Sequence, residues 1–286
     1  MSVPAAAFAL AAALLFALAA VAQQRVASRV PDDESLGLGL ARRLVTSPLW
    51  LVASVGDLVG YGLQAVALGL GAVVLVEPLL STMVLFALVI GAWSRRRRPS
   101  RGDLGWGALL CGGLALFLIV GDPSAGVDSA TWSAWTGPLA LVVGGTVLCV
   151  AVATRSRGTV RAVALGAGSG LMYGLSAPLT KSVVDLITGP TGPISAVSAW
   201  ESYALIVALG AGVFLQQSSF QAGSVAQSLP VTTVLSPVVA VFLGVTVLQE
   251  QVAFSGLTAV GVLVAAAAMA VATAALARDT TLEATA

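Results

Sequence analysis

The chain has 286 residues, of which 58% are hydrophobic and 9% charged, with a mean hydropathy of +0.97 and a formal net charge of +1. Soluble domains carry about 25% charged residues, so this composition excludes an ordinary soluble domain. Backbone groups in hydrocarbon need internal partners, which leaves helices or a closed barrel. Long unbroken apolar runs, such as 104–120 and 252–277, favour helices over the alternating strands of a barrel. The sequence therefore predicts an all-α polytopic membrane protein.

Apolar runs of about 20 residues, the length that crosses a bilayer, recur along the chain. We predict nine spans, at 3–22, 48–68, 70–93, 103–121, 134–153, 162–184, 199–219, 224–247 and 252–277. The first run ends at Ala20-Val21-Ala22, which resembles a signal-peptidase site. However, no Lys or Arg precedes it, and it is longer than the apolar core of about 7–15 residues in a signal peptide. We therefore expect it to remain as a span.

Lysine and arginine residues orient these spans. Under a nine-span count, all 14 basic residues except Lys181 fall on one side of the membrane. Cytoplasmic loops carry an excess of Lys and Arg, so this side is predicted to be cytoplasmic. The prediction is an inner-membrane protein with its N-terminus outside and its C-terminus inside. The run from Arg95 to Arg98 anchors this topology and is suited to contact anionic lipids.

A short pattern recurs after an offset of 152 residues. The matching pairs are Leu63 and Leu215, Gln64 and Gln216, Gly71 and Gly223, and Pro78 and Pro230, with Ser81 opposite Thr233. The two sets run in opposite senses under the predicted topology, which is typical of inverted-repeat transporters with a substrate site between the repeats. We predict a first repeat at 1–122, a connector with the fifth span at 123–160, a second repeat at 161–277, and a cytoplasmic tail at 278–286. A central cavity would lie between the repeats, with Pro78 and Pro230 as hinges.

Two acidic residues fall inside predicted spans, where a charged side chain at the bilayer centre costs about 2.5–3.5 kcal/mol. Asp57 lies in the second span, with Tyr61 and Gln64 four and seven residues later on the same helical face. Glu77 lies in the third span, one turn before Ser81. We predict that both acids face a shared cavity at similar depth and bind or couple the substrate. The alternative is a protonated acid hydrogen-bonded to a neighbouring helix.

The second repeat offers neutral polar residues instead of acids. Residues at i+3 and i+4 spacing form a predicted stripe along the eighth span, consisting of Gln221, Ser224, Ser228, Thr232 and Ser236. Together with Tyr173 and Gln216, these residues are candidates to line the cavity. Hydrogen bonding between helices is the alternative role for the stripe.

Lys181 is the basic residue that departs from the topology pattern. It precedes Asp185 by four residues near the outer end of the sixth span, a spacing that predicts either an interfacial ion pair or a functional site. Glu250 falls near the outer interface and is predicted to be solvated.

Catalytic and cofactor-binding patterns are not found in the sequence. It contains no histidine, no ATP-binding lysine motif and no nucleophile elbow. We therefore expect neither an enzyme nor a cofactor, and no use of ATP. A cation pathway would have to use oxygen ligands, with Asp57 and Glu77 as the metal-binding carboxylates.

Short segments spread over most of the chain share a family pattern. They are Gln23-Gln24-Arg25, Pro48-Leu49-Trp50, LQAVALGLGAVVLVEPLL at 63–80, Thr180-Lys181, LQQSSFQAGSVAQSLPV at 215–231, and LGVTVLQEQ at 243–251. They resemble the drug/metabolite transporter superfamily, most nearly its NIPA-like (magnesium-transporter-like) branch, and more loosely EamA-type repeats. The resemblance implies nine or ten helices in inverted repeats around a cavity, and secondary transport or channel-like passage. That branch has a small residue before the span-3 proline where this chain has Glu77, so the resemblance does not carry over a substrate.

The preferred interpretation is a secondary transporter or exporter of a small organic solute, proton-coupled through Asp57 and Glu77. The first alternative is a pathway for Mg²⁺ or another divalent cation, although the neutral stripe suits hydroxylated or amide solutes better. The second is a lipid-linked flippase, which would need a lateral opening to lipid, or a non-transporting membrane scaffold. Expected partners are a small solute, a proton or Mg²⁺, and membrane lipids; a homodimer is compatible with the pattern, and nothing indicates nucleic acid.

Overall fold

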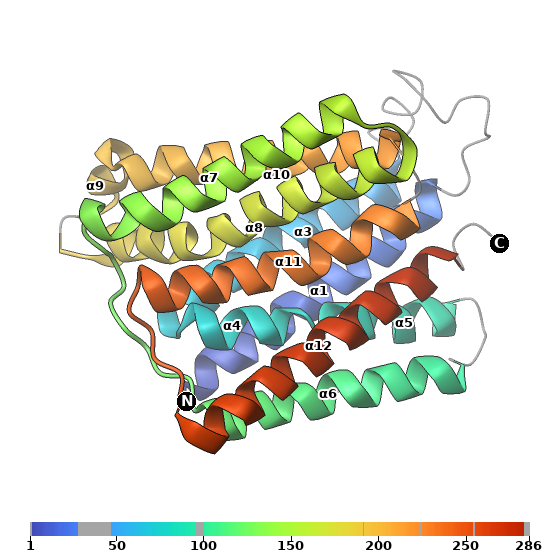
Figure 1. Cartoon of the computed structure of the whole chain (residues 1–286), viewed down its shortest axis with the longest axis horizontal. Helices are drawn as coiled ribbons and strands as arrows, with labels where there is room; N and C mark the ends of the chain where they lie inside the picture. Colours follow the sequence, from blue (N-terminus) through green and yellow to red (C-terminus); the bar gives the residue numbers. More distant parts are fainter. Residues whose placement is uncertain are drawn as a thin grey trace.

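The structure is a computed structural model that describes residues 2–27, 47–94, 100–190, 192–222, 225–253 and 255–282. Within these ranges the chain forms α-helices, with one isolated β-bridge between Ser124 and Gln251 (Figure 1). The helices are α1 (Val3–Ala27), α3 (Pro48–Leu70), α4 (Val73–Leu80), α5 (Met83–Ser94), α6 (Arg101–Gly121), α7 (Trp132–Arg155), α8 (Gly158–Thr188), α9 (Pro193–Ser198), α10 (Trp200–Ala222), α11 (Val225–Thr246) and α12 (Gly256–Leu282).

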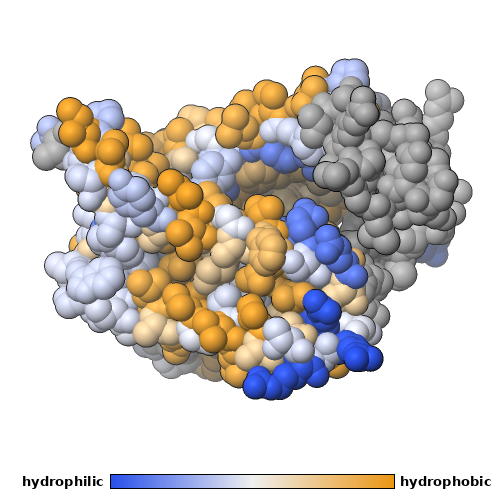
Figure 2. All heavy atoms as spheres, turned by 90° about the horizontal axis from the view of Figure 1, so that it is seen from above, coloured by the Kyte–Doolittle hydropathy of each residue, from blue (hydrophilic) through white to orange (hydrophobic). Residues whose placement is uncertain are grey.

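Nine helical segments of the described residues are long and apolar enough to cross a bilayer. They agree with the predicted spans to within a few residues, and α4 and α5 together form the third span. Large apolar side chains remain exposed on the outside, for example Leu257 at 90%, Trp93 at 82% and Ile119 at 79%. Such a surface, apolar over wide areas in Figure 2, suits hydrocarbon better than water. The all-α polytopic membrane fold is therefore confirmed.

The third span is broken in the middle. Pro78 has no N–H to donate to the carbonyl four residues earlier, and α4 ends two residues after it, at Leu80. Ser81, in the turn before α5, donates its hydroxyl to the backbone carbonyl of Glu77 at 3.3 Å. Pro230 lies within α11, which continues without a break to Thr246. Of the two predicted hinges, Pro78 alone precedes an interruption of its helix.

Helix packing follows the predicted correspondence between the two halves (Figure 1). Helix α1 packs along α3 and contacts α4 and α5, α8 packs along α10 and α11, and α6 packs on α12. Small residues on α1 and α8 permit these close approaches. They are the buried Ala5, Ala9, Ala12, Ala13 and Ala17 on α1 and, 157 residues later in each case, Ala162, Gly166, Ser169, Gly170 and Gly174 on α8.

An aromatic ring lies against a glycine once in each half. The ring of Phe16 on α1 contacts Gly60 on α3, and the ring of Tyr173 on α8 contacts Gly212 on α10. In both places a Cβ added to the glycine would lie 2.9 Å from the ring atom Cε1. Gly60 and Gly212 are 152 residues apart, the offset of the sequence pattern, so the two halves share this ring–glycine contact as well. The residue limits predicted for the two repeats stay a prediction.

Candidate functional site

A cavity of about 400 Å³ lies inside the bundle and is lined by α1, α3, α4, α5, α8, α10, α11 and α12. Eight of the candidate residues from the sequence line it together. The polar lining residues are Tyr61, Gln64, Glu77, Ser81, Tyr173, Ser176, Gln216, Thr232, Thr233, Ser236 and Thr273. The fold therefore brings most of the predicted polar residues into one site.

The lining residues occur in pairs that share the internal offset. At 152 residues the pairs are Gln64 and Gln216, Glu77 and Leu229, Leu80 and Thr232, Ser81 and Thr233, and Val84 and Ser236. The rings of Phe16 and Tyr173 also line the cavity from α1 and α8. The cavity thus lies between the two halves, where inverted-repeat transporters bind substrate. Three pairs differ in chemistry: a leucine is the counterpart of Glu77, and the hydroxyl residues Thr232 and Ser236 are the counterparts of Leu80 and Val84.

Glu77 is the acid among the described residues that line the cavity. Its side chain is buried, and its Oε1 accepts a hydrogen bond from Gln64 Nε2 at 3.2 Å. The register of the two helices explains this contact. Gln64 lies six residues before the end of α3 and Glu77 four residues after the start of α4, across a link of two residues. The amide therefore holds the carboxyl at the cavity wall.

Asp57 does not line this cavity, contrary to the expectation that the two acids share it. It lies seven residues before Gln64 on α3, about 10 Å away along the helix axis. Its Oδ2 accepts a hydrogen bond from Gln23 Nε2 on α1 at 2.6 Å. The expectation of similar depth is wrong because the α3–α4 hairpin brings Gln64, and not Asp57, level with Glu77.

Hydroxyl groups on the cavity wall link neighbouring helices. Tyr173 on α8 donates to Gln216 Oε1 on α10 at 3.0 Å. Thr232 on α11 donates to the backbone carbonyl of Gly166 on α8 at 2.9 Å. These bonds fix the second-half lining residues in position, and they use the hydroxyl protons of both side chains.

Other hydroxyl groups around the cavity also donate their protons to acceptors of the protein itself. Thr180 Oγ1 donates to the carbonyl of Ser176 at 2.7 Å, so Tyr61, whose Oη lies 2.8 Å from that Oγ1, is the donor in their bond. Hydroxyls that donate to carbonyls of their own chain segment are those of Ser81, Ser176 and Thr233. A hydroxyl has one proton and two acceptor lone pairs, so these groups retain acceptors alone. The wall is therefore rich in hydrogen-bond acceptors.

Parts of the predicted eighth-span stripe lie elsewhere. Gln221 belongs to the exposed end of α10, so its assignment to the eighth span is wrong. Ser228 is fully buried against Gly166, and its Oγ has no hydrogen-bond partner among the described residues. Ser224 lies outside the described residues. Thr232 and Ser236 are the stripe residues that line the cavity.

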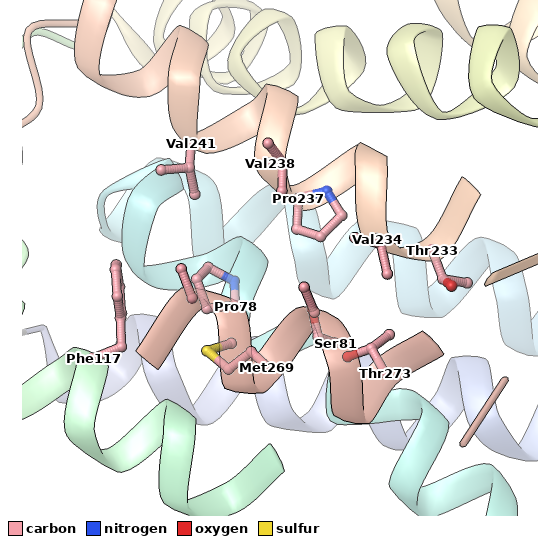
Figure 3. Close-up of a pocket in the computed structure, with 12 residues that line it drawn as sticks. Pro78, Ser81, Phe117, Thr233, Val234, Pro237, Val238, Val241, Met269 and Thr273 are labelled. Atoms are coloured by element: carbon pink, nitrogen blue, oxygen red, sulfur yellow. The ribbon is translucent and has the colours of Figure 1, made fainter. Parts of the chain in front are cut away.

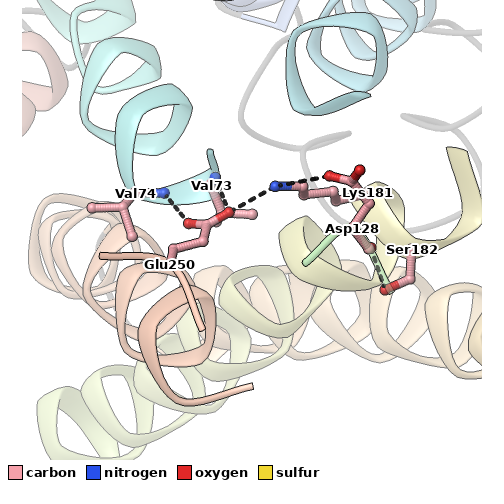
Figure 4. Close-up of polar contacts among 6 residues, drawn as sticks. All are labelled: Val73, Val74, Asp128, Lys181, Ser182 and Glu250. Carbon is pink, nitrogen blue, oxygen red and sulfur yellow. Dashed lines mark hydrogen bonds and ion pairs between the residues drawn. The ribbon is translucent and has the colours of Figure 1, made fainter. Parts of the chain in front are cut away.

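Lys181 is buried and pairs with residues other than the predicted one. Its side chain is 1% exposed, and its Nζ lies 2.9 Å from Glu250 Oε1 and 3.5 Å from Asp128 Oδ1 (Figure 4). The predicted interfacial pair with Asp185 is wrong, because Glu250 and Asp128 take its place. We call Lys181, Glu250 and Asp128 the charged cluster.

Glu250, predicted to be solvated, is instead buried at the start of α4 (Figure 4). Its Oε1 accepts from Val73 N at 2.7 Å and its Oε2 from Val74 N at 2.8 Å. These are N–H groups of a first helical turn, which have no partner within the helix, and Ala72 at the N-cap offers no side-chain acceptor. A carboxylate also favours the positive end of the helix dipole. Glu250 therefore joins α4, α8 and the segment after α11.

The charged cluster lies at one end of the bundle, beside two paired connecting segments. Ser124 N donates to Gln251 O at 3.0 Å, and Gln251 N donates back at 3.2 Å. The cavity extends toward the other end: Gln216 lies six residues before the end of α10, and Leu229 lies four residues after the start of α11. That end also carries the α7–α8 junction, with its exposed arginines Arg155, Arg157 and Arg161.

A second, apolar hollow of about 180 Å³ shares lining residues with the polar cavity. Figure 3 shows the side chains around it. We call it the apolar groove; its lining residues are Pro78, Ser81, Phe117, Thr233, Val234, Pro237, Val238, Val241, Ala266, Met269, Ala270 and Thr273. It lies between α4, α6, α11 and α12. Sequence reasoning missed it, because most of its residues are apolar and they come from four helices.

A comparison with known proteins gives one informative relative. The chain is 33% identical to an uncharacterized protein of Corynebacterium glutamicum over 282 residues, which cover 97% of this chain and 96% of that protein. The chain belongs to the same family as this corynebacterial protein. No protein-family profile matches the chain. No solved structure matches it either.

A metal site built from several acids does not form in the part of the chain that the structure describes. No group of three His, Cys, Asp or Glu side chains is placed to hold an ion there. Asp57 and Glu77, the two predicted carboxylate ligands, bond to different glutamines. A cation bound in the cavity would therefore have one carboxyl, from Glu77, together with neutral oxygens.

Proposed function

We propose that this protein is a secondary transporter that moves a small organic solute across the cytoplasmic membrane, coupled to protons through Glu77. The observation that carries the proposal is the position of this carboxyl, buried on the wall of a polar cavity between the two halves of the bundle. Ionisable side chains within membrane spans are rare and mark substrate or ion pathways and proton relays. A carboxyl held by a neutral amide, Gln64, can gain and lose a proton without breaking an ion pair.

Transport by alternating access needs a site that is open to one side while closed to the other. The charged cluster and the paired connecting segments tie helices together at one end of the bundle, which we assign to the outside. The cavity residues extend toward the end with Arg155, Arg157 and Arg161, which the positive-inside rule assigns to the cytoplasm. We therefore assign this conformation as inward-facing. The break after Pro78 would allow α4 to move relative to α5 when the outer end opens.

The cavity chemistry favours an organic solute over a metal ion. Mg²⁺ keeps several waters and binds through one or two carboxylates in near-octahedral geometry. The cavity supplies one carboxyl among many hydroxyl and amide groups, which match a solute that carries O–H or N–H donors. The resemblance to the drug/metabolite transporter superfamily adds to this proposal. Passage of Mg²⁺ remains the second candidate, through Glu77, Gln64 and Tyr61.

The experiment is a transport screen with the purified chain in proteoliposomes, with and without an imposed pH gradient. Radiolabelled polyols, amines, amides and Mg²⁺ would be tested against protein-free vesicles and vesicles that contain Glu77→Gln. We expect accumulation of an organic solute that follows the proton gradient and is lost in the variant. Accumulation of Mg²⁺ alone would contradict the preferred substrate class, and unchanged proton-driven uptake in Glu77→Gln would contradict the coupling role.

A further inference from the structure

The polar cavity and the apolar groove share part of their walls. Ser81, Thr233, Pro237 and Thr273 line both. A molecule can therefore occupy the two spaces at once, with its polar part on the side of Glu77 and its apolar part on the side of Met269. Two adjoining spaces of opposite polarity indicate a ligand that is itself divided into a polar and an apolar part.

The groove also reaches the outer surface of the bundle. Val238, one of its lining residues, is 53% exposed, and Ala266 on α12 is exposed as well. In a chain that spans the membrane, exposed apolar residues at this depth contact lipid tails. The groove thus gives the cavity a side contact with the hydrocarbon, between α11 and α12.

The two volumes bound the size of such a ligand. An apolar protein cavity of about 150 Å³ holds a benzene molecule. The groove, at about 180 Å³, is therefore large enough for one ring or a short stretch of alkyl chain. The polar cavity, at about 400 Å³, is larger than the groove, so the polar part of the ligand can be larger than the apolar part that the groove holds. Any further part of a chain would lie in the lipid beyond Val238.

The hydroxyl groups at the junction between the two spaces favour a particular chemistry in the polar part of the ligand, which we call its head. Ser81 Oγ donates to the carbonyl of Glu77, and Thr233 Oγ1 donates to that of Leu229 at 3.0 Å. Both oxygens keep acceptor lone pairs and have no proton left to donate. A head that enters past these residues is stabilised when it carries its own hydroxyl protons.

We infer that the substrate is a single-chain amphiphile with a hydroxyl-rich head, which enters the cavity sideways from the lipid through the apolar groove. This inference rests on the proposed transport function and names its substrate class. The head occupies the polar cavity beside Glu77 and Gln64, and the first part of the chain occupies the groove beside Met269 and Ala270. Transport then moves the head across the bilayer while the chain stays in hydrocarbon.

The test is photolabelling of the full-length protein in phosphatidylcholine nanodiscs, since that headgroup carries no hydrogen-bond donor. Three probes carry the same diazirine: an alkyl glycerol with the diazirine in its chain, its dimethyl ether, and a short diol without the chain. Adducts are mapped by mass spectrometry. We expect the alkyl glycerol to label groove residues on α11 and α12 about tenfold more than its ether does.

Two matched variants of α12 sharpen the test. Ala270→Phe fills the groove, whereas Ala267→Phe adds the same ring to the exposed side of the helix outside it. Groove labelling should fall about tenfold in Ala270→Phe and stay unchanged in Ala267→Phe. Equal labelling by the glycerol and its ether, or equal labelling of the two variants, would overturn the inference.

The chainless diol separates this inference from the transport proposal. If the diol labels the polar cavity while the alkyl glycerol shows no preference for the groove, the substrate is water-soluble. That outcome overturns the amphiphile and leaves proton-coupled transport standing, because the uptake screen and Glu77→Gln test the latter independently.

Discussion

Lys181 Nζ lies 2.9 Å from Glu250 Oε1, and the two side chains are 1% and 0% exposed. The pair connects Lys181, seven residues before the end of α8, to a carboxylate that also accepts two backbone N–H groups at the start of α4. Breaking a buried ion pair by removing one partner leaves an uncompensated charge. Glu250, held by Lys181 and bonded to the start of α4, is therefore a structural joint between the two halves of the bundle.

The first prediction concerns the stability of this joint. Lys181→Met leaves Glu250 buried without its cation, and we expect the free energy of unfolding to fall by about 3–5 kcal/mol. The measurement is unfolding of the purified protein in detergent. Asp185→Asn, which changes the partner expected from sequence, serves as the matched control and should leave stability nearly unchanged. The double variant Lys181→Met/Glu250→Gln should recover part of the loss, and a double variant as unstable as the sum of both single changes would contradict the coupling.

The second prediction concerns which end of the cavity is covered. Thr233→Cys, placed in a chain whose Cys111 and Cys149 are replaced by alanine, should react with a membrane-impermeant thiol reagent from the cytoplasmic side alone. Ser198→Cys on α9, which is exposed at the opposite end, should react from the outside. Faster reaction of Thr233→Cys from the outside would show that the charged cluster does not close the cavity.

The third prediction concerns topology. Reporter fusions in the 155–158 junction should report a cytoplasmic location, because this loop and its neighbours carry Arg155, Arg157 and Arg161. Fusions in the 122–131 segment should report the outside. The reverse pattern would refute the assignment of both ends and with it the inward-facing assignment.

The fourth prediction uses the glycines that face aromatic rings. Gly60→Ala and Gly212→Ala would each place a Cβ 2.9 Å from a ring atom, and overpacking of this kind costs about 1–3 kcal/mol. Gly62→Ala and Gly210→Ala meet no atom within 4 Å and should be neutral or stabilising, because alanine is the better helix former. The comparison is made by unfolding in detergent. If all four variants behaved alike, the ring contacts of Phe16 and Tyr173 would not be formed.

The nine spans could be predicted because hydropathy and span length act along the chain, one segment at a time. The partner of Lys181 could not be predicted in this way. Glu250 lies 69 residues from Lys181, and its carboxylate binds the start of α4 at Val73, 177 residues before Glu250 in the sequence. The available signal was Ala72, a residue unable to cap the helix that follows it. An apolar helix start without a cap implies a distant acceptor, and the sequence does not say which one.

In the polar cavity, too, some residues could be predicted from the sequence and others could not. Gln64, Gln216, Ser81 and Thr233 were found from a shared offset, which preserves position within each half and so survives folding. Asp57 was expected at the depth of Glu77 because a short turn joins their spans, whereas the depth of a side chain depends on where the α3–α4 hairpin turns. The offset carried three-dimensional information about these residues, and the shortness of the turn did not.

The last prediction separates the two acids. Glu77 lines the cavity and Asp57 bonds to Gln23 outside it, so their neutral variants should differ. Glu77→Gln keeps an oxygen that can accept from Gln64 but cannot exchange a proton, so uptake in proteoliposomes should lose its dependence on the pH gradient while the protein still folds, since a neutral amide is less costly to bury than a charge. Asp57→Asn should keep that dependence and lose only stability, by about 1 kcal/mol for a weakened hydrogen bond. Equal loss of proton coupling in the two variants would return Asp57 to the transport pathway and contradict the assignment of coupling to Glu77 alone.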